Sequence, residues 1–305
     1  MQPTIRFAKG HGTENDFVLV PDLDGELELP GPVVAALCDR RAGIGGDGLI
    51  RIVRSAALPE GVAQAGQADW FMDYRNADGS LAEMCGNGVR VFVRYLLAAG
   101  LVQLADGDEV AVGTRAGVKR VRRDGEGFAV DLGPWRISGG VDAAAAAEDA
   151  TVRLPGEHLG LPGLSVDVGN PHVVVALPDL ERLAAADLSR PPVVEPVPAA
   201  GVNVELVVPV HDARAHLRMR VHERGVGETR SCGTGAVAAV LAARVWAGEH
   251  APDVWQVDVP GGRLQVRAPH GRLLDGPAVE LSGPAVLVAE GTVDLSRRAL
   301  SAAVG

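Results

Sequence analysis

The chain has few aromatic residues and no excess of positive charge. Aromatics make up 4% of its 305 residues, and its formal net charge is −10. Nucleic-acid binding draws on clustered lysine and arginine that acids do not offset, and often on aromatic side chains that stack with bases. The composition therefore argues against a nucleic-acid-binding protein, and we expect no nucleic-acid partner.

Long apolar runs are also missing. No uncharged stretch reaches the roughly 18 residues that suggest a membrane-spanning helix. The opening residues, MQPTIRFAKGHG, contain no apolar segment of the kind found in secretory signals. We therefore expect a cytoplasmic protein without a membrane partner. With 47% hydrophobic residues, the chain is long enough for two domains that each have a core.

Lysine and cysteine are scarce as well. Lys9 and Lys119 are the only lysines among 29 basic residues, and enzymes that use pyridoxal phosphate need a lysine for the Schiff base. The three cysteines lack the spacing of a disulfide scaffold or a zinc site. We therefore expect neither a cofactor nor a metal. Cys38, in the helix-like segment PVVAALCDRR, is predicted to be a small core side chain.

The other two cysteines begin similar segments. Cys85 lies in AEMCGNGVRVFVRYLLAAG and Cys232 lies in TRSCGTGAVAAVLAARVWAG, so both read Cys-Gly-x-Gly followed by an apolar run. A second pair of similar segments precedes them, NDFVLVPDL from residue 15 and NPHVVVALPDL from residue 170. The interval from the first asparagine of each segment to the cysteine that follows it is similar in the two halves, which indicates an internal duplication.

Short strand-like segments outnumber helical ones along the chain. Alternating or β-branched runs bounded by Gly, Pro, Asp or Asn recur, whereas helices are predicted at residues 33–41, 87–99, 179–186 and 234–247. This excess of strands argues against a doubly wound parallel sheet. We expect an α+β fold of two pseudo-symmetric halves, each a mainly antiparallel sheet curled around a central helix.

The same pattern gives the expected division of the chain. The N-terminal half is residues 1–132, completed by a C-terminal strand within 286–305, and the C-terminal half is residues 133–285. Two further segments, DAAAAAEDA from residue 142 and RPPVVEPVPAAG from residue 190, are expected to be connecting loops.

Each Cys-Gly-x-Gly segment places a thiol at a predicted helix N-terminus. The unpaired N–H groups and partial positive charge there form an anion site, which can hold a substrate carboxylate. The same site stabilises a thiolate, so we expect the pKa of each thiol to fall below its usual value of about 8.5. Two thiols on opposite faces of one carbon could remove one proton and deliver another. The pattern predicts a racemase or epimerase without a cofactor.

Two other functions fit the paired cysteines. Opposed thiols can form a redox disulfide, and two helix N-termini can hold an anion in a binding protein that catalyses no reaction. The polar residues around the cysteines are expected to distinguish these functions.

Six separated segments resemble the diaminopimelate epimerase family, in the family's order: GHGTENDFVLV, RRAGIGGDG, RNADGSLAEMCGNGVR, VGNPHVVV, GVNVELV and ERGVGETRSCGTG. The resemblance implies two like domains with a site in the cleft between them. It implies an isomerase, independent of pyridoxal phosphate, that interconverts L,L- and meso-2,6-diaminopimelate for lysine and peptidoglycan synthesis. It also implies a homodimer.

The resemblance assigns roles by motif. Cys85 resembles the proton-donating thiol and Cys232 the accepting one, and these roles exchange when the reaction reverses. His172 and Glu223 resemble residues that support catalysis. The positions that receive the carboxylate at the reacting carbon are Gly86, Asn87, Gly233 and Thr234. The other implied substrate contacts are Asn15, Asn76, Asn170, Asn203, Glu223 and Arg224.

The chemistry of these side chains suits a substrate with two amino-acid ends. The guanidinium of Arg224 can hold a distal carboxylate through two hydrogen bonds. The carboxylate of Glu223 can accept from an ammonium group, and asparagines can both donate and accept.

One position departs from the family, and one related family is a rival. Gln often follows the Asp of the Gly-Ile-Gly-x-Asp segment, whereas Gly48 follows Asp47 here, so residue 48 offers no side-chain contact. Asp47 and Gly45 are expected only to form the loop. Proline racemases typically have Cys-Gly-His-Gly at the first thiol and Asp-Arg-Ser-Pro before the second. This chain has Asn87 and ETRS at those places.

Overall fold

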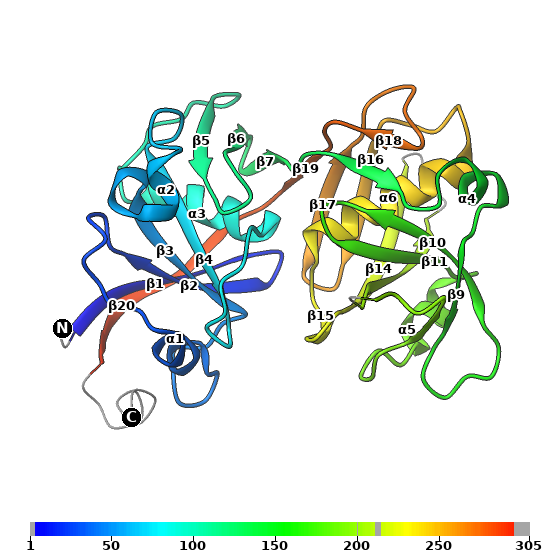
Figure 1. Cartoon of the computed structure of the whole chain (residues 1–305), viewed down its shortest axis with the longest axis horizontal. Coiled ribbons are helices and arrows are strands. Elements are labelled where there is room, and N and C mark those ends of the chain that lie inside the picture. The colour runs from blue at the N-terminus through cyan, green and yellow to red at the C-terminus, as the bar shows by residue number, and fades with distance from the viewer. Residues whose placement is uncertain (1–3, 200, 211–214, 296–305) are drawn as a thin grey trace. The chain divides into compact units, whose positions relative to one another are not determined.

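A computed structural model describes residues 4–199, 201–210 and 215–295 of the chain (Figure 1). The chain divides into two compact units. The N-terminal unit runs to Val130 and resumes at Gly283, and the C-terminal unit spans Asp131–Ser282. None of the helices in the described ranges has both the length and the apolar character needed to cross a bilayer.

The sheet of the N-terminal unit starts with its last strand in sequence. β20 (Val286–Asp294) pairs antiparallel with β1 (Thr4–Gly12), and β1 pairs antiparallel with β2 (Asn15–Pro21). The order then continues through parallel, antiparallel, parallel and two antiparallel pairings. The strands concerned are β3 (Gly48–Arg54), β4 (Trp70–Asn76), β5 (Glu109–Gly113), β6 (Lys119–Asp124) and β7 (Gly127–Asp131).

The sheet of the C-terminal unit repeats this arrangement. β8 (Trp135–Ile137) pairs antiparallel with β10 (Leu161–Asp167), and β10 pairs antiparallel with β11 (Pro171–Ala176). Five further pairings follow, and in order they are parallel, antiparallel, parallel, antiparallel and antiparallel. The strands concerned are β13 (Asn203–Pro209), β14 (His216–Glu223), β16 (Val254–Val259), β17 (Gly262–Arg267) and β19 (Glu280–Gly283).

The two pairing patterns are the same from first strand to last, as a duplicated supersecondary unit requires. β20 holds the place in the N-terminal unit that β8 holds in the C-terminal unit. The predicted fold class is therefore confirmed: a mainly antiparallel α+β fold built by internal duplication. Residues 296–305 of the expected C-terminal segment lie outside the described ranges.

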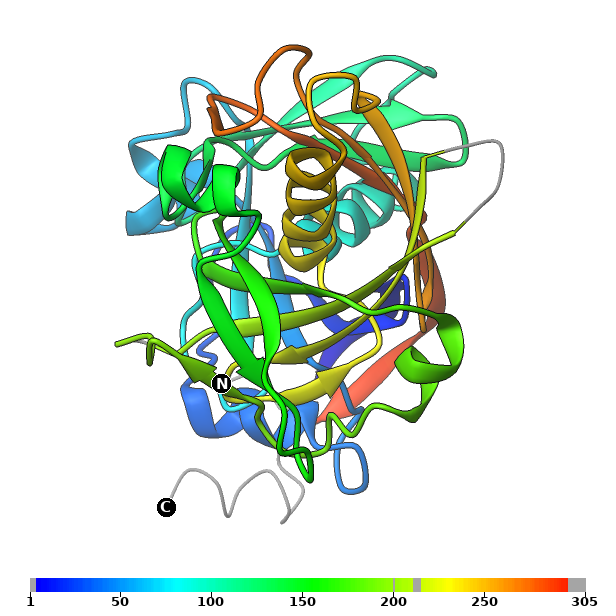
Figure 2. The same cartoon turned by 90° about the vertical axis from the view of Figure 1, so that its right-hand side faces the viewer.

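One long helix lies against the sheet of each unit. α3 (Gly86–Ala98) contacts β1, β2, β3, β4, β6 and β20, and α6 (Gly233–Ala247) contacts β10, β11, β13, β14, β16 and β17 (Figure 2). In α6 every residue from Ala236 to Arg244 is buried. A helix that is apolar on all sides is stable only when it is surrounded, so the curled sheet and the central helix depend on each other.

The remaining elements are short. They are α1 (Gly31–Cys38), η1 (Ser55–Ala57), α2 (Pro59–Val62), α4 (Gly140–Ala146), α5 (Leu180–Ala185), β9 (Ala150–Arg153), β12 (Val193–Glu195), β15 (Gly227–Thr229) and β18 (Asp275–Gly276). Cys38 is buried in the core around α1, as predicted, and its burial raises the pKa of the thiol to about 12.

Two of the expected loops contain regular structure. The alanine-rich segment that begins near residue 142 overlaps α4. Only Ala143 of this helix is buried, so its formation depends on the high intrinsic helix propensity of alanine more than on packing. Within the proline-rich segment, β12 pairs with β9. The prediction that these segments are loops was therefore wrong, because one contains part of a short helix and the other a short strand.

The loop that follows β4 packs tightly against the start of α1. Gly79 in this loop has a left-handed backbone (φ +85°), and a Cβ placed there would lie 2.2 Å from the carbonyl oxygen of Gly31. Gly117 has the same φ of +85°, but nothing lies within 4 Å of its added Cβ. The two glycines therefore share a conformational cost on substitution and differ in steric cost.

We expect Gly79→Ala to lower the free energy of unfolding by about 3 kcal/mol, since left-handed strain and overpacking add. Gly117→Ala should lower it by about 1 kcal/mol through strain alone. Urea denaturation of both variants measures the difference. Equal losses would contradict the close packing of this loop on α1.

Candidate active site

Cys85 forms the N-cap of α3. Its backbone is extended (φ −139°, ψ 121°), and its Sγ accepts a hydrogen bond from the backbone N–H of Gly88 at 3.4 Å. This geometry is that of a serine or aspartate N-cap, with sulfur in place of oxygen. A Cβ on Gly88 would lie 3.3 Å from the Cβ of Cys85, so the small residue gives the half-buried thiol its room.

Cys232 forms the N-cap of α6 in the same way. Its backbone is extended (φ −124°, ψ 117°), and its Sγ accepts from the N–H of Gly235 at 3.4 Å. A Cβ on Gly235 would lie 2.7 Å from Oε1 of Glu205 and 3.3 Å from the sulfur. The prediction that both cysteines begin helices is confirmed. Gly86 and Asn87, and likewise Gly233 and Thr234, fall in the first turns.

Amide side chains surround Cys85. Its S–H donates to Oδ1 of Asn15 at 3.6 Å, and Nδ2 of Asn87 donates to the same oxygen at 3.2 Å. Asn76, at the end of β4, is exposed and donates to Oγ of Ser80 at 3.0 Å. Two of the three predicted asparagines of this unit therefore lie beside the thiol, and the third is held in the loop that follows β4.

Asp47 does more than form its loop, contrary to expectation. Its Oδ2 accepts from Nδ2 of Asn15 at 2.7 Å, and its Oδ1 accepts from Arg40 at 2.7 Å. Arg40 also bonds to Asp16, which forms an ion pair with Lys9. Burial opposes ionisation of Asp16, but hydrogen bonds from Arg40 and Lys9 outweigh it and hold the pKa of that carboxyl well below its usual range.

A buried, hydrogen-bonded pair of side chains lies among the candidate residues of the C-terminal unit. Nδ1 of His172 lies 2.7 Å from Oε1 of Glu205, and both side chains are fully buried. Nε2 of His172 lies 3.0 Å from Oδ1 of Asn170. Oε2 of Glu205 has no hydrogen-bond partner among the described residues. Glu205 was not among the residues predicted from the sequence, although a carboxylate inside the apolar strand GVNVELVV is itself a signal of an internal partner.

Glu223 and Arg224 lie at the end of β14, next to Asn203 at the start of the neighbouring strand β13. Thr229 donates from its hydroxyl to Oε1 of Glu223, and Oδ1 of Asn203 accepts from the backbone N–H of Arg224 at 2.9 Å. Burial raises the pKa of the Glu223 carboxyl, although hydrogen bonds from Thr229 and from the thiol of Cys232 act against it. Glu223 is therefore one acidic neighbour of Cys232.

The pKa of Cys232 is raised well above its ordinary value, first by burial and then by the negative charges of Glu223 and Glu205. Hydrogen bonds from Thr234 and from the N–H of Gly235 act in the opposite direction and are weaker. The expected lowering of this pKa was wrong. The partial charge of a helix N-terminus does not offset two nearby carboxylates in a buried site.

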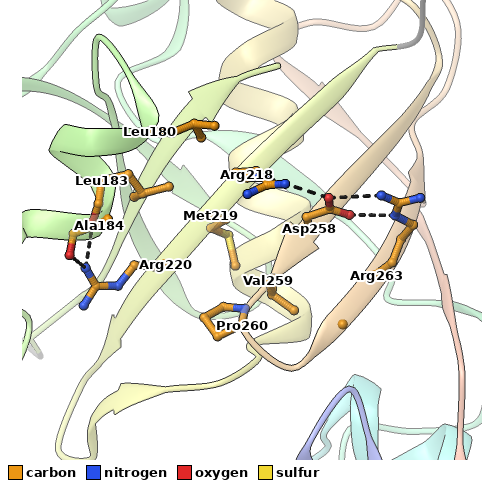
Figure 3. Close-up of a pocket in the computed structure, with 11 residues that line it drawn as sticks. Leu180, Leu183, Ala184, Arg218, Met219, Arg220, Asp258, Val259, Pro260 and Arg263 are labelled. Atoms are coloured by element: carbon orange, nitrogen blue, oxygen red, sulfur yellow. Dashed lines mark hydrogen bonds and ion pairs between the residues drawn. The ribbon is translucent and has the colours of Figure 1, made fainter. Parts of the chain in front are cut away.

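A separate cavity of about 520 Å³ lies in the C-terminal unit, between α5 and strands β14, β16 and β17 (Figure 3). None of the predicted site residues lines it. Each of its three arginines lies near a carboxylate: Arg263 lies 2.6 Å and Arg218 3.9 Å from Asp258, and Arg220 lies 2.7 Å from Glu228.

The sequence is similar to known proteins over most of its length. The pattern of the family described as diaminopimelate epimerase matches residues 7–137 and 164–285. The chain is 52% identical over 301 residues to a diaminopimelate epimerase of Thermobifida fusca, covering 96% of this chain and 99% of that protein. It is 51% identical over 302 residues to one of Streptomyces coelicolor, covering 96% and 97%.

Solved structures at low identity share the fold. A hydroxyproline epimerase from Agrobacterium vitis superposes with a TM-score of 0.65 at 15% identity, covering 97% of this chain and 94% of that one. A protein of the PhzF family from Bacillus anthracis superposes with a TM-score of 0.64 at 16% identity, covering 95% and 99%. These likenesses concern the fold alone.

The raised pKa of Cys232 can be measured through its alkylation. Since only the thiolate reacts rapidly, we expect iodoacetamide to modify Cys232, in the absence of substrate, only at a pH above the range in which an ordinary thiol reacts. Glu223→Gln should move the midpoint about one pH unit lower because it removes a neighbouring negative charge. Peptide mapping by mass spectrometry follows the modified cysteine.

Glu228→Gln is the matched control. Glu228 carries the same charge on the neighbouring strand β15 but pairs with Arg220 at 2.7 Å, so its loss should leave the midpoint unchanged. A wild-type midpoint at or below that of an ordinary thiol would contradict the raised pKa.

Proposed function

The chain belongs to the diaminopimelate epimerase family, and we propose that it interconverts L,L- and meso-2,6-diaminopimelate by transferring protons between the α-carbon and two thiols. The observation that carries the proposal is the repeated device in the duplicated fold: each central helix begins with a cysteine as its N-cap. Two equivalent proton carriers are what inversion at an acidic carbon requires.

Cys232 and Cys85 have opposite roles in the proposal. In the forward direction Glu223 takes the proton of Cys232, and the resulting thiolate removes the α-proton of the substrate. The thiol of Cys85, which donates to Asn15 in the free protein, delivers its proton to the opposite face of the carbanion. In the reverse direction the two cysteines exchange roles. The pair His172 and Glu205 supports the site beneath Cys232.

The first turns of α3 and α6 stabilise the carbanion in this proposal. The backbone N–H groups of Gly86, Asn87, Gly233 and Thr234 lie in the first turns, where the helix itself supplies no carbonyl acceptor. They bind the α-carboxylate, which takes up negative charge as the proton leaves, and this stabilises the transition state more than the ground state.

Further polar side chains suit the two amino-acid ends of the substrate. Arg224 binds the distal carboxylate, and Glu223 accepts from an ammonium group. Asn203 fixes the backbone of Arg224 through its hydrogen bond to that N–H. We assign Asn15, Asn76 and Asn170 to substrate contacts, because their amides both donate and accept.

The cellular part of the proposal follows from the family. The product is a precursor of lysine and peptidoglycan, and the enzyme acts in the cytoplasm as a homodimer, without pyridoxal phosphate. Its domains are residues 1–132 with the strand within 286–305, and residues 133–285. The pairing of β20 with β1 supports this division.

We expect the purified protein, kept reduced and given no cofactor, to convert L,L-diaminopimelate to the meso form, as chiral chromatography would show. Cys85→Ala and Cys232→Ala should each lose epimerisation, since one face of the carbon then has no proton carrier. Cys38→Ala is the matched control and should retain it, because Cys38 is a core side chain. Turnover of proline in place of diaminopimelate would favour the proline racemase alternative instead.

A further inference from the structure

A chain of four polar side chains runs beside Cys85. Nη2 of Arg90 donates to Oδ1 of Asn87 at 2.9 Å, and Nδ2 of Asn87 donates to Oδ1 of Asn15 at 3.2 Å. Nδ2 of Asn15 then donates to Oδ2 of Asp47 at 2.7 Å. A charged group therefore lies at each end, and two asparagines lie between them.

The two ends dictate the direction of every bond in the chain. A guanidinium can only donate, and an ionised carboxylate can only accept, whereas an asparagine amide can turn over and exchange its oxygen for its nitrogen. Arg90 can therefore bond only to the amide oxygen of Asn87, and Asp47 can bond only to the amide nitrogen of Asn15. We infer that Arg90 and Asp47 are positioning residues, which fix the amide orientations of Asn87 and Asn15 at the catalytic thiol.

Arg90 is an unusual residue for the inner face of a helix. It is completely buried, and its Nε and Nη1 have no hydrogen-bond partner among the described residues. Burial lowers its pKa only to about 10, so it remains a cation at neutral pH. An incompletely paired buried charge generally weakens a fold compared with an apolar side chain. Packing alone therefore gives no reason for an arginine at this position, whereas orientation of Asn87 does.

The surroundings of Arg90 are shaped around its contact with Asn87. A Cβ on Gly12 would lie 3.0 Å from Nη2 of Arg90 and 3.1 Å from the carbonyl oxygen of Asn87. Glycine at residue 12 thus leaves room for the guanidinium beside the first turn of α3.

The orientation matters because of what Asn15 presents to the sulfur. Its Oδ1 accepts from the S–H of Cys85 at 3.6 Å. If the amide turned over, its N–H groups would face the sulfur and would favour the thiolate. This inference rests on the proposed function, in which Cys85 must hold its proton until the carbanion forms. In this inference, the hydrogen-bonded series from Arg90 to Asp47 keeps the thiol of Cys85 protonated until that step.

The first test is Asp47→Asn, which replaces an obligate acceptor by a group that can also donate. Asp47 is partly exposed, so the variant should fold. We expect iodoacetamide to alkylate Cys85 about tenfold faster at pH 8, and kcat/KM to fall about tenfold, the equivalent of one hydrogen bond. Asp16→Asn removes the same charge from the same ion cluster without touching Asn15, and should change each value less than threefold. Equal effects of the two variants would overturn the inference.

The second test is Arg90→Met, with Arg94→Met as its control on the exposed face of α3. Positioning predicts that Arg90→Met keeps or raises Tm while kcat/KM falls about tenfold, and that Arg94→Met changes neither. A lowered Tm with unchanged kcat/KM would show a structural role and overturn the inference. If Arg90→Met does not fold, the inference is likewise overturned for Arg90, and Asp47→Asn still decides it for Asp47.

Failure of the inference and failure of the proposed function give different results. Alkylation of Cys85 needs no substrate, so it reports the polar chain whatever the enzyme acts on. If the wild-type protein does not epimerise diaminopimelate, the proposed function fails. If it does so and Asp47→Asn matches Asp16→Asn in both measurements, only the positioning inference fails.

Discussion

The site depends on one constraint: a cysteine has to cap a buried helix. The first turn of α3 and that of α6 leave backbone N–H groups without partners, and the sulfurs of Cys85 and Cys232 each accept one of them. The cap fixes the thiol at the end of the helix, and the curled sheet holds the helix in place. In the proposed function the first turn of each helix also binds the substrate carboxylate. In that proposal, thiol and anion site are one structural element, which duplication of the fold supplied twice.

The two units share their strand pairings and their N-cap geometry, but the side chains around the two cysteines differ. Cys85 lies among amides and Cys232 lies next to carboxylates. Burial, together with the negative charges of Glu223 and Glu205, raises the pKa of Cys232, and in the proposed function Glu223 takes its proton. The asymmetry suits a reaction that needs one thiol and one thiolate at the same moment.

The sequence predicted the parts of the fold that depend on local pattern. The central helices begin within a residue of the expected 87–99 and 234–247, since Cys-Gly-x-Gly followed by an apolar run signals a helix start strongly. The sequence did not reveal Glu205, Asp47 or the role of Arg90. Glu205 and Asp47 bond to residues that are distant along the chain, and the role proposed for Arg90 depends on how a side-chain amide is turned. Neither kind of contact produces a periodic pattern in the sequence. The raised pKa of Cys232 was missed for the same reason, because its burial and its nearness to Glu223 and Glu205 arise only in the folded chain.

The central claim is that two thiols act on opposite faces of one carbon, and the hydrogen carried by the product tests it most directly. The reaction is run in heavy water from unlabelled L,L-diaminopimelate and stopped at low conversion. The delivering thiol carries solvent deuterium, so the account predicts meso product labelled at the inverted carbon while the remaining substrate is mostly unlabelled. Meso product that retains the substrate's own hydrogen would contradict the account, because a single base would then have moved the proton from one face to the other.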